Sequence, residues 1–115
     1  MAGLGYIDDR SYAEAKAAAM GRRGLGARRV AGMLRQAGVQ GDDAEAVAPA
    51  IQDRAVDTAI TFARRRRIGP FADQVADRAT REKQIAAMLR GGHSPALARR
   101  IAMMAPGDDF DELHE

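Results

Sequence analysis

The sequence of 115 residues contains no cysteine and no tryptophan, and its aromatic residues are limited to three Phe and two Tyr. The absence of cysteine excludes a disulfide framework, a thiolate zinc site and a cysteine nucleophile. The shortage of aromatic residues argues against a β-sandwich or β-barrel. The longest stretch free of Asp, Glu, Lys and Arg is the eight residues from Gly91 to Ala98. Because a membrane-spanning helix needs about 20 apolar residues, we expect no membrane partner.

What the chain has in abundance is alanine, with 25 residues, and arginine, which supplies 16 of the 18 basic side chains. Both are strong helix formers. The length fits one small domain or a few stacked helical units. The start, MAGLGYIDDR, lacks the basic and apolar regions of a secretory signal, so we expect a cytoplasmic protein. Composition therefore predicts an all-α fold.

The charges are unevenly distributed along the chain. The last eight residues carry five acidic side chains and no Lys or Arg, while the first 107 residues carry 18 basic and 11 acidic side chains, a balance of +7. A basic body with an acidic tail favours an anionic partner, either nucleic acid or an acidic protein surface. A compositional preference for arginine on solvated helices explains the same numbers.

Capping residues, apolar spacing and glycine breaks predict six helices, over residues of about 10–20, 27–36, 44–51, 53–67, 73–90 and 95–104. Pro49 either shortens or kinks the third of these. The pair Ser94-Pro95 is a strong helix start, with serine as the N-cap and proline in the first helical position. The helix start near Ala27 offers free backbone N–H groups to an anion.

An internal repeat is present at a spacing of 55 residues. The segment Val30–Arg35 matches the segment Ile85–Arg90, and an arginine-rich turn precedes each of them. We therefore predict two tandem three-helix repeats in an elongated, curved arrangement. The predicted boundaries are residues 1–51 and 52–107, followed by a mobile acidic tail over 108–115, for which Phe110 and Leu113 are possible anchors.

Patterns that carry enzymatic chemistry are missing from the sequence. It has no Ser/His/Asp set, no metal-ligand cluster and no nucleotide fingerprint, so we expect no enzyme, no cofactor and no metal. The pair Asp8 and Asp9 is better explained by helix capping than by acid–base chemistry. The two histidines, His93 and His114, are isolated and are predicted to be solvated.

Four segments, taken in order, resemble the RecX family of regulators of the bacterial recombinase RecA: GYIDDRSYAEA, RRGLGARRVAGMLRQAGV, ARRRRIGP and IAAMLRGGHSPALARRI. The resemblance covers about residues 4–105. The positions that define the motif are Gly5, Tyr6, Asp8, Asp9, Tyr12, Gly24, Gly26 and Leu34. Residues 4–7 resemble the end of a preceding repeat, so we expect the chain to lack most of the family's first repeat.

The resemblance implies a fold and a function. The family fold is a curved array of three-helix repeats, usually three of them. The implied function is to bind the RecA–DNA filament and to damp ATP hydrolysis and strand exchange in homologous recombination and DNA repair, as a monomer without a catalytic step. Two alternatives stay open: a stand-alone basic helical module that binds single- or double-stranded DNA, and a plain helical scaffold.

Two arginine clusters are the candidate contacts with the filament or with DNA, because guanidinium groups bind phosphate and carboxylate bidentately. The first cluster consists of Arg22, Arg23, Arg28 and Arg29 around a glycine-rich turn, with Arg35 about two turns further on. The second cluster is the run Arg64, Arg65, Arg66 and Arg67. Arginine stems that cover a thin alanine-rich core explain the second cluster equally well.

Overall fold

The computed structural model describes residues 9–115, and every regular element among them is a helix, which confirms the all-α prediction. Residues 9–115 contain six α-helices and two short 3-10 helices. The α-helices are α1 (Asp9–Arg22), α2 (Ala27–Gln36), α3 (Gly41–Asp53), α4 (Ala55–Arg66), α5 (Arg78–Arg90) and α6 (Pro95–Ala102); the 3-10 helices are η2 (Gly69–Phe71) and η3 (Phe110–His114).

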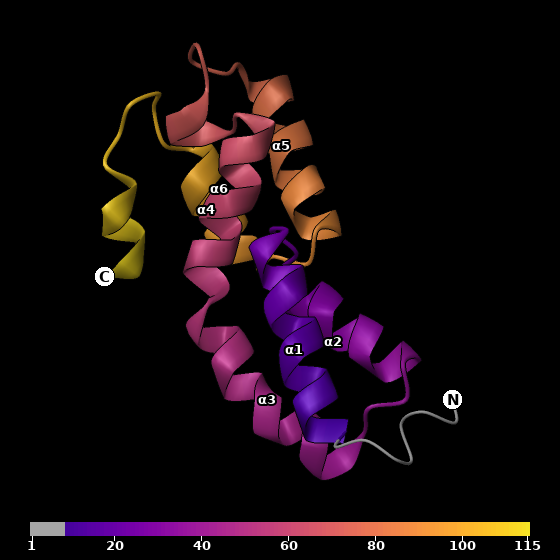
Figure 1. Cartoon of the computed structure of the whole chain (residues 1–115). Helices are drawn as coiled ribbons and strands as arrows, with labels where there is room; N and C mark the ends of the chain where they lie inside the picture. The colour runs from indigo at the N-terminus through magenta and orange to yellow at the C-terminus, as the bar shows by residue number, and fades with distance from the viewer. Residues whose placement is uncertain (1–8) are drawn as a thin grey trace.

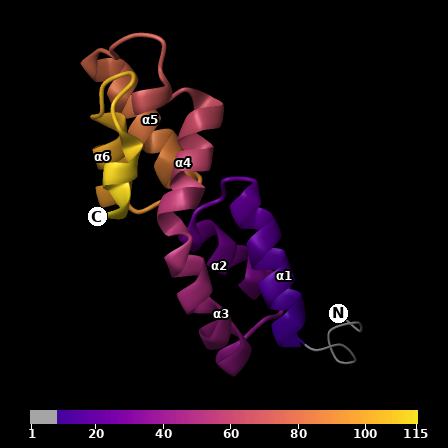
Figure 2. The same ribbon diagram turned by 60° about the vertical axis from the view of Figure 1, so that its left-hand side comes forward.

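The helices form two groups along an elongated molecule of 51 × 25 × 19 Å. In both views α3 and α4 follow one another along the length of the molecule, with α1 and α2 beside α3, and α5 and α6 beside α4 (Figures 1 and 2). Each group has its own hydrophobic cluster. The N-terminal cluster consists of Ala13, Ala17, Met20, Val30, Leu34, Val39 and Val47. The C-terminal cluster consists of Ala59, Ile60, Phe62, Ala63, Ile68, Met88, Ala98, Ile101, Ala102 and Leu113.

Most of the apolar helix faces that the sequence spacing predicts are buried in the two hydrophobic clusters. Val30 and Leu34 of α2 are buried, as are Ala59, Ile60 and Ala63 of α4. In α5, however, only Met88 is fully buried, and Leu89 is 41% exposed. Small alanine side chains let the helices approach closely, so few large residues complete each cluster. Whether the two clusters belong to two copies of one repeat stays a prediction.

The start of the fifth helix differs from the prediction. The helix begins at Arg78 and not near residue 73, because the carboxylate of Asp77 accepts a hydrogen bond from the backbone N–H of Thr80 at 2.8 Å. Such a side-chain cap satisfies one of the donors at a helix start. Asp73, the expected cap, instead pairs with Arg67 at 3.1 Å.

The third helix is longer than predicted and continues through Pro49, from Gly41 to Asp53. A proline inside a helix leaves the carbonyl four residues earlier without its usual donor. Here both Pro49 and Glu45 lie on the exposed side of α3, where water can satisfy that carbonyl. The proline is therefore tolerated and does not end the helix.

The acidic tail was expected to be mobile, but the structure places it against the C-terminal cluster. Residues 110–114 form η3, and Leu113 is 4% exposed. The ring of Phe110 lies 4.9 Å from that of Phe71. These are the two anchors that the sequence suggested, and burial of their apolar side chains holds the segment in place.

The two groups of helices meet where two glycine turns touch, and we call this contact the joint (residues 23–28 and 91–93). The backbone N–H of Gly26 donates to the carbonyl of Gly91 at 2.7 Å, and the N–H of Arg28 donates to the carbonyl of Gly92 at 3.1 Å. The joint is therefore a main-chain contact between the turn that precedes α2 and the turn that precedes α6.

Side chains are excluded from the middle of the joint. A Cβ atom at Gly26 would overlap the carbonyl group of Gly92, and a Cβ atom at Gly92 would lie 2.5 Å from the backbone nitrogen of Arg29. Gly92 also has a φ of +95°, which favours glycine. Both positions therefore require glycine for the two turns to approach.

Replacement of the two glycines near the start of α2 is expected to have opposite effects. Gly26→Ala should lower the free energy of unfolding by about 1–3 kcal/mol, because the new methyl group must push the two backbones apart. Gly32→Ala should raise it by about 0.5–1 kcal/mol, since Gly32 lies within α2 and its nearest neighbour would be 3.7 Å away. Urea unfolding of both variants checks this pair, and equal effects would contradict the packing described for the joint.

Candidate functional site

A buried histidine side chain links the two turns of the joint. His93 is 3% exposed, its Nε2 lies 3.0 Å from the carbonyl oxygen of Gly24, and its ring meets the ring of Phe62 edge-on at 5.0 Å. A carbonyl only accepts, so Nε2 carries the proton and donates. Burial lowers the pKa of His93 below its ordinary value of 6.5. The expectation of a solvated His93 was wrong, because the glycine turns leave room for the ring.

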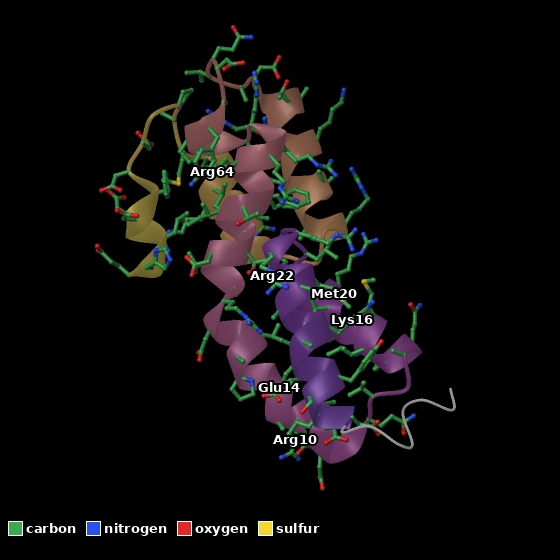
Figure 3. All side chains as sticks on the ribbon, viewed as in Figure 1. Arg10, Glu14, Lys16, Met20, Arg22 and Arg64 are labelled. Atoms are coloured by element: carbon green, nitrogen blue, oxygen red, sulfur yellow. The ribbon has the colours of Figure 1, made fainter. Side chains whose placement is uncertain are left out.

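The first arginine cluster lies around the joint. Arg22 and Arg23 are at the end of α1, and Arg28 and Arg29 are in the first turn of α2, all with exposed side chains (Figure 3 labels Arg22). The Nη1 atom of Arg29 lies 3.5 Å from the carbonyl oxygen of Arg90, at the end of α5. Positive charge is favoured there because the carbonyl groups at a helix C-terminus carry partial negative charge.

The four arginines of the second cluster have different surroundings. Arg65 joins the first cluster, since its guanidinium donates to the carbonyl oxygens of Arg23 at 3.0 Å and of Arg22 at 3.4 Å. The guanidinium of Arg66 lies over the ring of Phe62, 4.9 Å from its centre. Arg65 thus ties the end of α1 to α4, and Arg66 covers the core beside the joint.

The other two members point elsewhere. Arg64 lies over the ring of Phe71 at 4.8 Å, on the side of the C-terminal segment (Figure 3). Arg67 pairs with Asp73. Consecutive residues of a helix spread around its circumference, and Arg67, with a φ of +56°, lies just past the end of α4, so the four do not form one patch. Packing on aromatic rings and pairing with acid account for both side chains.

Four of the predicted arginines keep their guanidinium groups available. Within residues 9–115, neither a hydrogen bond nor an ion pair engages the guanidinium groups of Arg22, Arg23, Arg28 and Arg35. Three of them flank the joint, and Arg35 lies in the last turn of α2. These side chains are exposed and unpaired, so they are the ones best placed to bind an anion.

The backbone donors expected at the start of α2 are only partly available. The N–H of Arg28 already donates to the carbonyl of Gly92, and Gly26 provides no side-chain cap. The contribution of this helix start to anion binding therefore depends more on its arginine side chains than on free N–H groups.

Sequence reasoning missed one residue of this surface, Arg90. It is exposed at the end of α5 and its carbonyl receives the contact from Arg29. The internal repeat contained the signal, because Arg90 is the counterpart of Arg35 in the matched segments. The role of Arg65 as a hydrogen-bond donor to two carbonyls of another helix had no signal in the sequence.

The motif residues have structural surroundings where they are described. Gly5, Tyr6 and Asp8 lie outside the described residues, and Asp9 is the first residue of α1. Tyr12 packs on the N-terminal cluster, and Leu34 is buried in it. Gly24, with a φ of +88°, lies against the backbone of Phe62, 3.2 Å from where its Cβ would be. Gly26 is in the joint.

Two further features bear on the class of site. Among residues 9–115, no group of three or more His, Cys, Asp or Glu side chains is placed to hold a metal ion. In the same part of the chain, no helix combines the length and the apolar character that crossing a membrane requires.

The chain is similar to a known regulator. It is 34% identical, over 103 aligned residues, to the regulatory protein RecX of Myxococcus xanthus (strain DK1622). The match covers 84% of this chain and 54% of that protein, so the chain spans about half the length of this relative. No protein-family model matches the sequence, and no solved structure matches it.

The buried ring of His93 predicts a specific dependence of stability on pH. The pKa of His93 is lower in the folded protein than its ordinary value of 6.5. His93 therefore contributes stability that is fully present above pH 6.5 and is lost as the pH falls from 6.5 through the lowered pKa. His93→Gln keeps a donor for Gly24 but cannot be protonated, so the free energy of unfolding of this variant should fall less on acidification. Urea titrations at several pH values check this. Parallel curves for the two proteins would contradict a buried neutral His93.

Proposed function

Because the chain belongs to the RecX family, we propose that it binds the RecA–DNA filament and reduces its ATPase and strand-exchange activities. Binding is noncovalent, and no residue of the chain takes part in a chemical step. The observation that carries the proposal, beside family membership, is the group of unpaired guanidinium groups at the joint, namely Arg22, Arg23 and Arg28.

Rigidity makes this group of charges suited to recognition. The two joint hydrogen bonds hold the main chain at Gly26 and at Arg28, and Arg65 holds the main chain at Arg22 and Arg23. Binding then costs less conformational entropy than if the arginines lay on a mobile loop. A nucleoprotein filament offers both phosphate and carboxylate groups, and guanidinium groups bind either.

The elongated shape of the molecule supports an inhibitory role. A ligand changes the rate of its partner's reaction cycle when it binds one state of that partner more tightly than the other states. An elongated body of 51 Å, anchored near its middle by arginines, contacts the filament over an extended surface. Rearrangements of the filament that break these contacts then become slower, including those that ATP hydrolysis and strand exchange require.

Charge reversal at the joint tests the proposal. The double variant Arg23→Glu, Arg28→Glu should bind RecA filaments about tenfold more weakly or worse. Its binding should also depend less on salt, by about one unit of slope for each phosphate that an arginine no longer neutralises. Filament ATPase and light scattering at stepped salt concentrations measure the effect. The matched control is Arg78→Glu, at the start of α5, whose side chain is 93% exposed.

Three results are possible in this experiment. Weakening by the double variant and not by the control supports the proposal. Unchanged ATPase inhibition by the double variant would contradict it. Equally tight binding of the wild type to bare DNA, without recombinase, would favour the alternative of a basic DNA-binding module.

A further inference from the structure

The acidic C-terminal segment (residues 108–115) is seated on the protein by two apolar side chains. Phe110 and Leu113 are three residues apart, so they lie on the same face of the 3-10 helix η3. Leu113 is buried in the C-terminal cluster, and Phe110 contacts Phe71. We call the surface beneath them, formed by α4, η2 and α6, the seat.

Polar contacts between the segment and the seat are few. The Nη2 atom of Arg100 donates to the carbonyl oxygen of Glu112 at 2.8 Å, and His114 Nε2 lies 2.7 Å from Asp57 Oδ1 at an exposed position. Arg64 lies 5.5 Å from the ring centre of Phe110. The carboxylates of the segment make no ion pair with an arginine of the seat within residues 9–115. The seat thus binds a backbone carbonyl, the imidazole of His114 and two apolar side chains.

The cations of the seat favour an acidic occupant even without direct ion pairs. Arg64, Arg99 and Arg100 are exposed on the helices that carry the seat. A segment with acidic residues on its outer face is attracted to this surface by the field of these cations. The resident segment has this pattern, because Phe110 and Leu113 face inward while Asp111 and Glu112 are exposed.

The seat continues into a cleft that the segment leaves open. The cleft has a volume of about 460 Å³ and runs from the seat to the joint. Arg100 belongs to both the seat and the cleft, Leu113 of the segment borders the cleft, and Arg28 stands at the joint end. The walls include Val56 and Leu97. The combined surface therefore offers more room than η3 occupies, with partly apolar walls and a guanidinium group at either end.

The lining favours a peptide over a nucleic acid. Single-stranded nucleic acids bind by stacking their bases on aromatic side chains. The residues that line the cleft include no Phe, Tyr or Trp, and the ring of His93 is engaged with Gly24 and Phe62. Walls that combine aliphatic side chains such as Val56 and Leu97 with the polar side chains of Gln52 and Ser94, between two arginines, instead suit a segment that alternates apolar and acidic side chains.

We propose that the seat and the cleft form a docking surface for an acidic segment of a partner protein with two apolar side chains three residues apart, and that the segment 108–115 occupies the seat until the partner displaces it. Its tether contains Pro106 and Gly107, and Gly107 has a φ of +84°. A tethered segment competes at an effective concentration on the order of millimolar. This inference goes beyond the proposed function and does not depend on it.

A peptide-binding experiment on the full chain tests the proposal. The probe is a fluorescein-labelled synthetic peptide with the sequence of residues 106–115, PGDDFDELHE. The full-length variant Phe110→Ala, Leu113→Ala, which releases the resident segment, should bind this peptide at least tenfold more tightly than the wild type by fluorescence anisotropy. A peptide with alanine at the same two positions should not bind.

A second variant covers the possibility that the double variant unfolds. His114→Ala removes only an exposed contact, so its fold should be retained, and it should bind the peptide more tightly than the wild type. Circular dichroism verifies the helix content of both variants. Failure of both to bind the peptide saturably, or stronger binding of a single-stranded oligonucleotide at the same surface, would overturn the proposal. Neither RecA nor a filament is present, so this result is independent of the filament assay.

Discussion

The close approach of two glycine turns is the constraint on which the rest of the structure depends. Two main-chain hydrogen bonds cross the joint, and a Cβ atom at Gly26 or Gly92 would force the turns apart. The separation of the two helical groups, the burial of His93 and the position of the first arginine cluster all follow from this contact. Close main-chain packing uses no large side chains, which suits a chain with 25 alanines and few aromatic residues.

The arginines of the chain fall into two kinds, and the surrounding structure explains the difference. Arg64, Arg65 and Arg66 lie on α4, where aromatic rings and carbonyl groups at the end of α1 receive them. Within residues 9–115, Arg22, Arg23 and Arg28 meet neither, because the turn before α2 is occupied by its contact with Gly92 and His93. Guanidinium groups that are not needed for packing are the ones available to a partner. Under the proposed function, binding and stability therefore draw on different members of the two clusters.

Much of the fold could be predicted from local sequence signals. Ser94 caps α6 as expected, with its side chain accepting from the N–H of Leu97, and apolar spacing identified Val30 and Leu34 as core residues. Local signals failed where a competing interaction decided the outcome. Asp73 resembles a helix cap as closely as Asp77 does, but in the structure the carboxylate of Asp77 caps the helix at Thr80, whereas that of Asp73 pairs with Arg67.

The candidate site was only partly predictable for a related reason. Exposed arginines around a glycine turn could be recognised from the sequence, but which guanidinium groups were engaged depended on residues distant in the chain. Arg65 bonds to carbonyls 42 and 43 residues away, and His93 to one 69 residues away. No periodicity or capping rule contains such contacts, because they arise from the packing of the two helical groups.

Amide hydrogen exchange measures whether the joint is a rigid main-chain contact. The N–H groups of Gly26 and Arg28 donate across the joint, whereas that of Gln74 lies in the exposed loop before α5. The account predicts that the amides of Gly26 and Arg28 exchange as slowly as that of Val30 within α2. Exchange as fast as that of Gln74 would contradict it, because the arginines would then lie on a mobile turn.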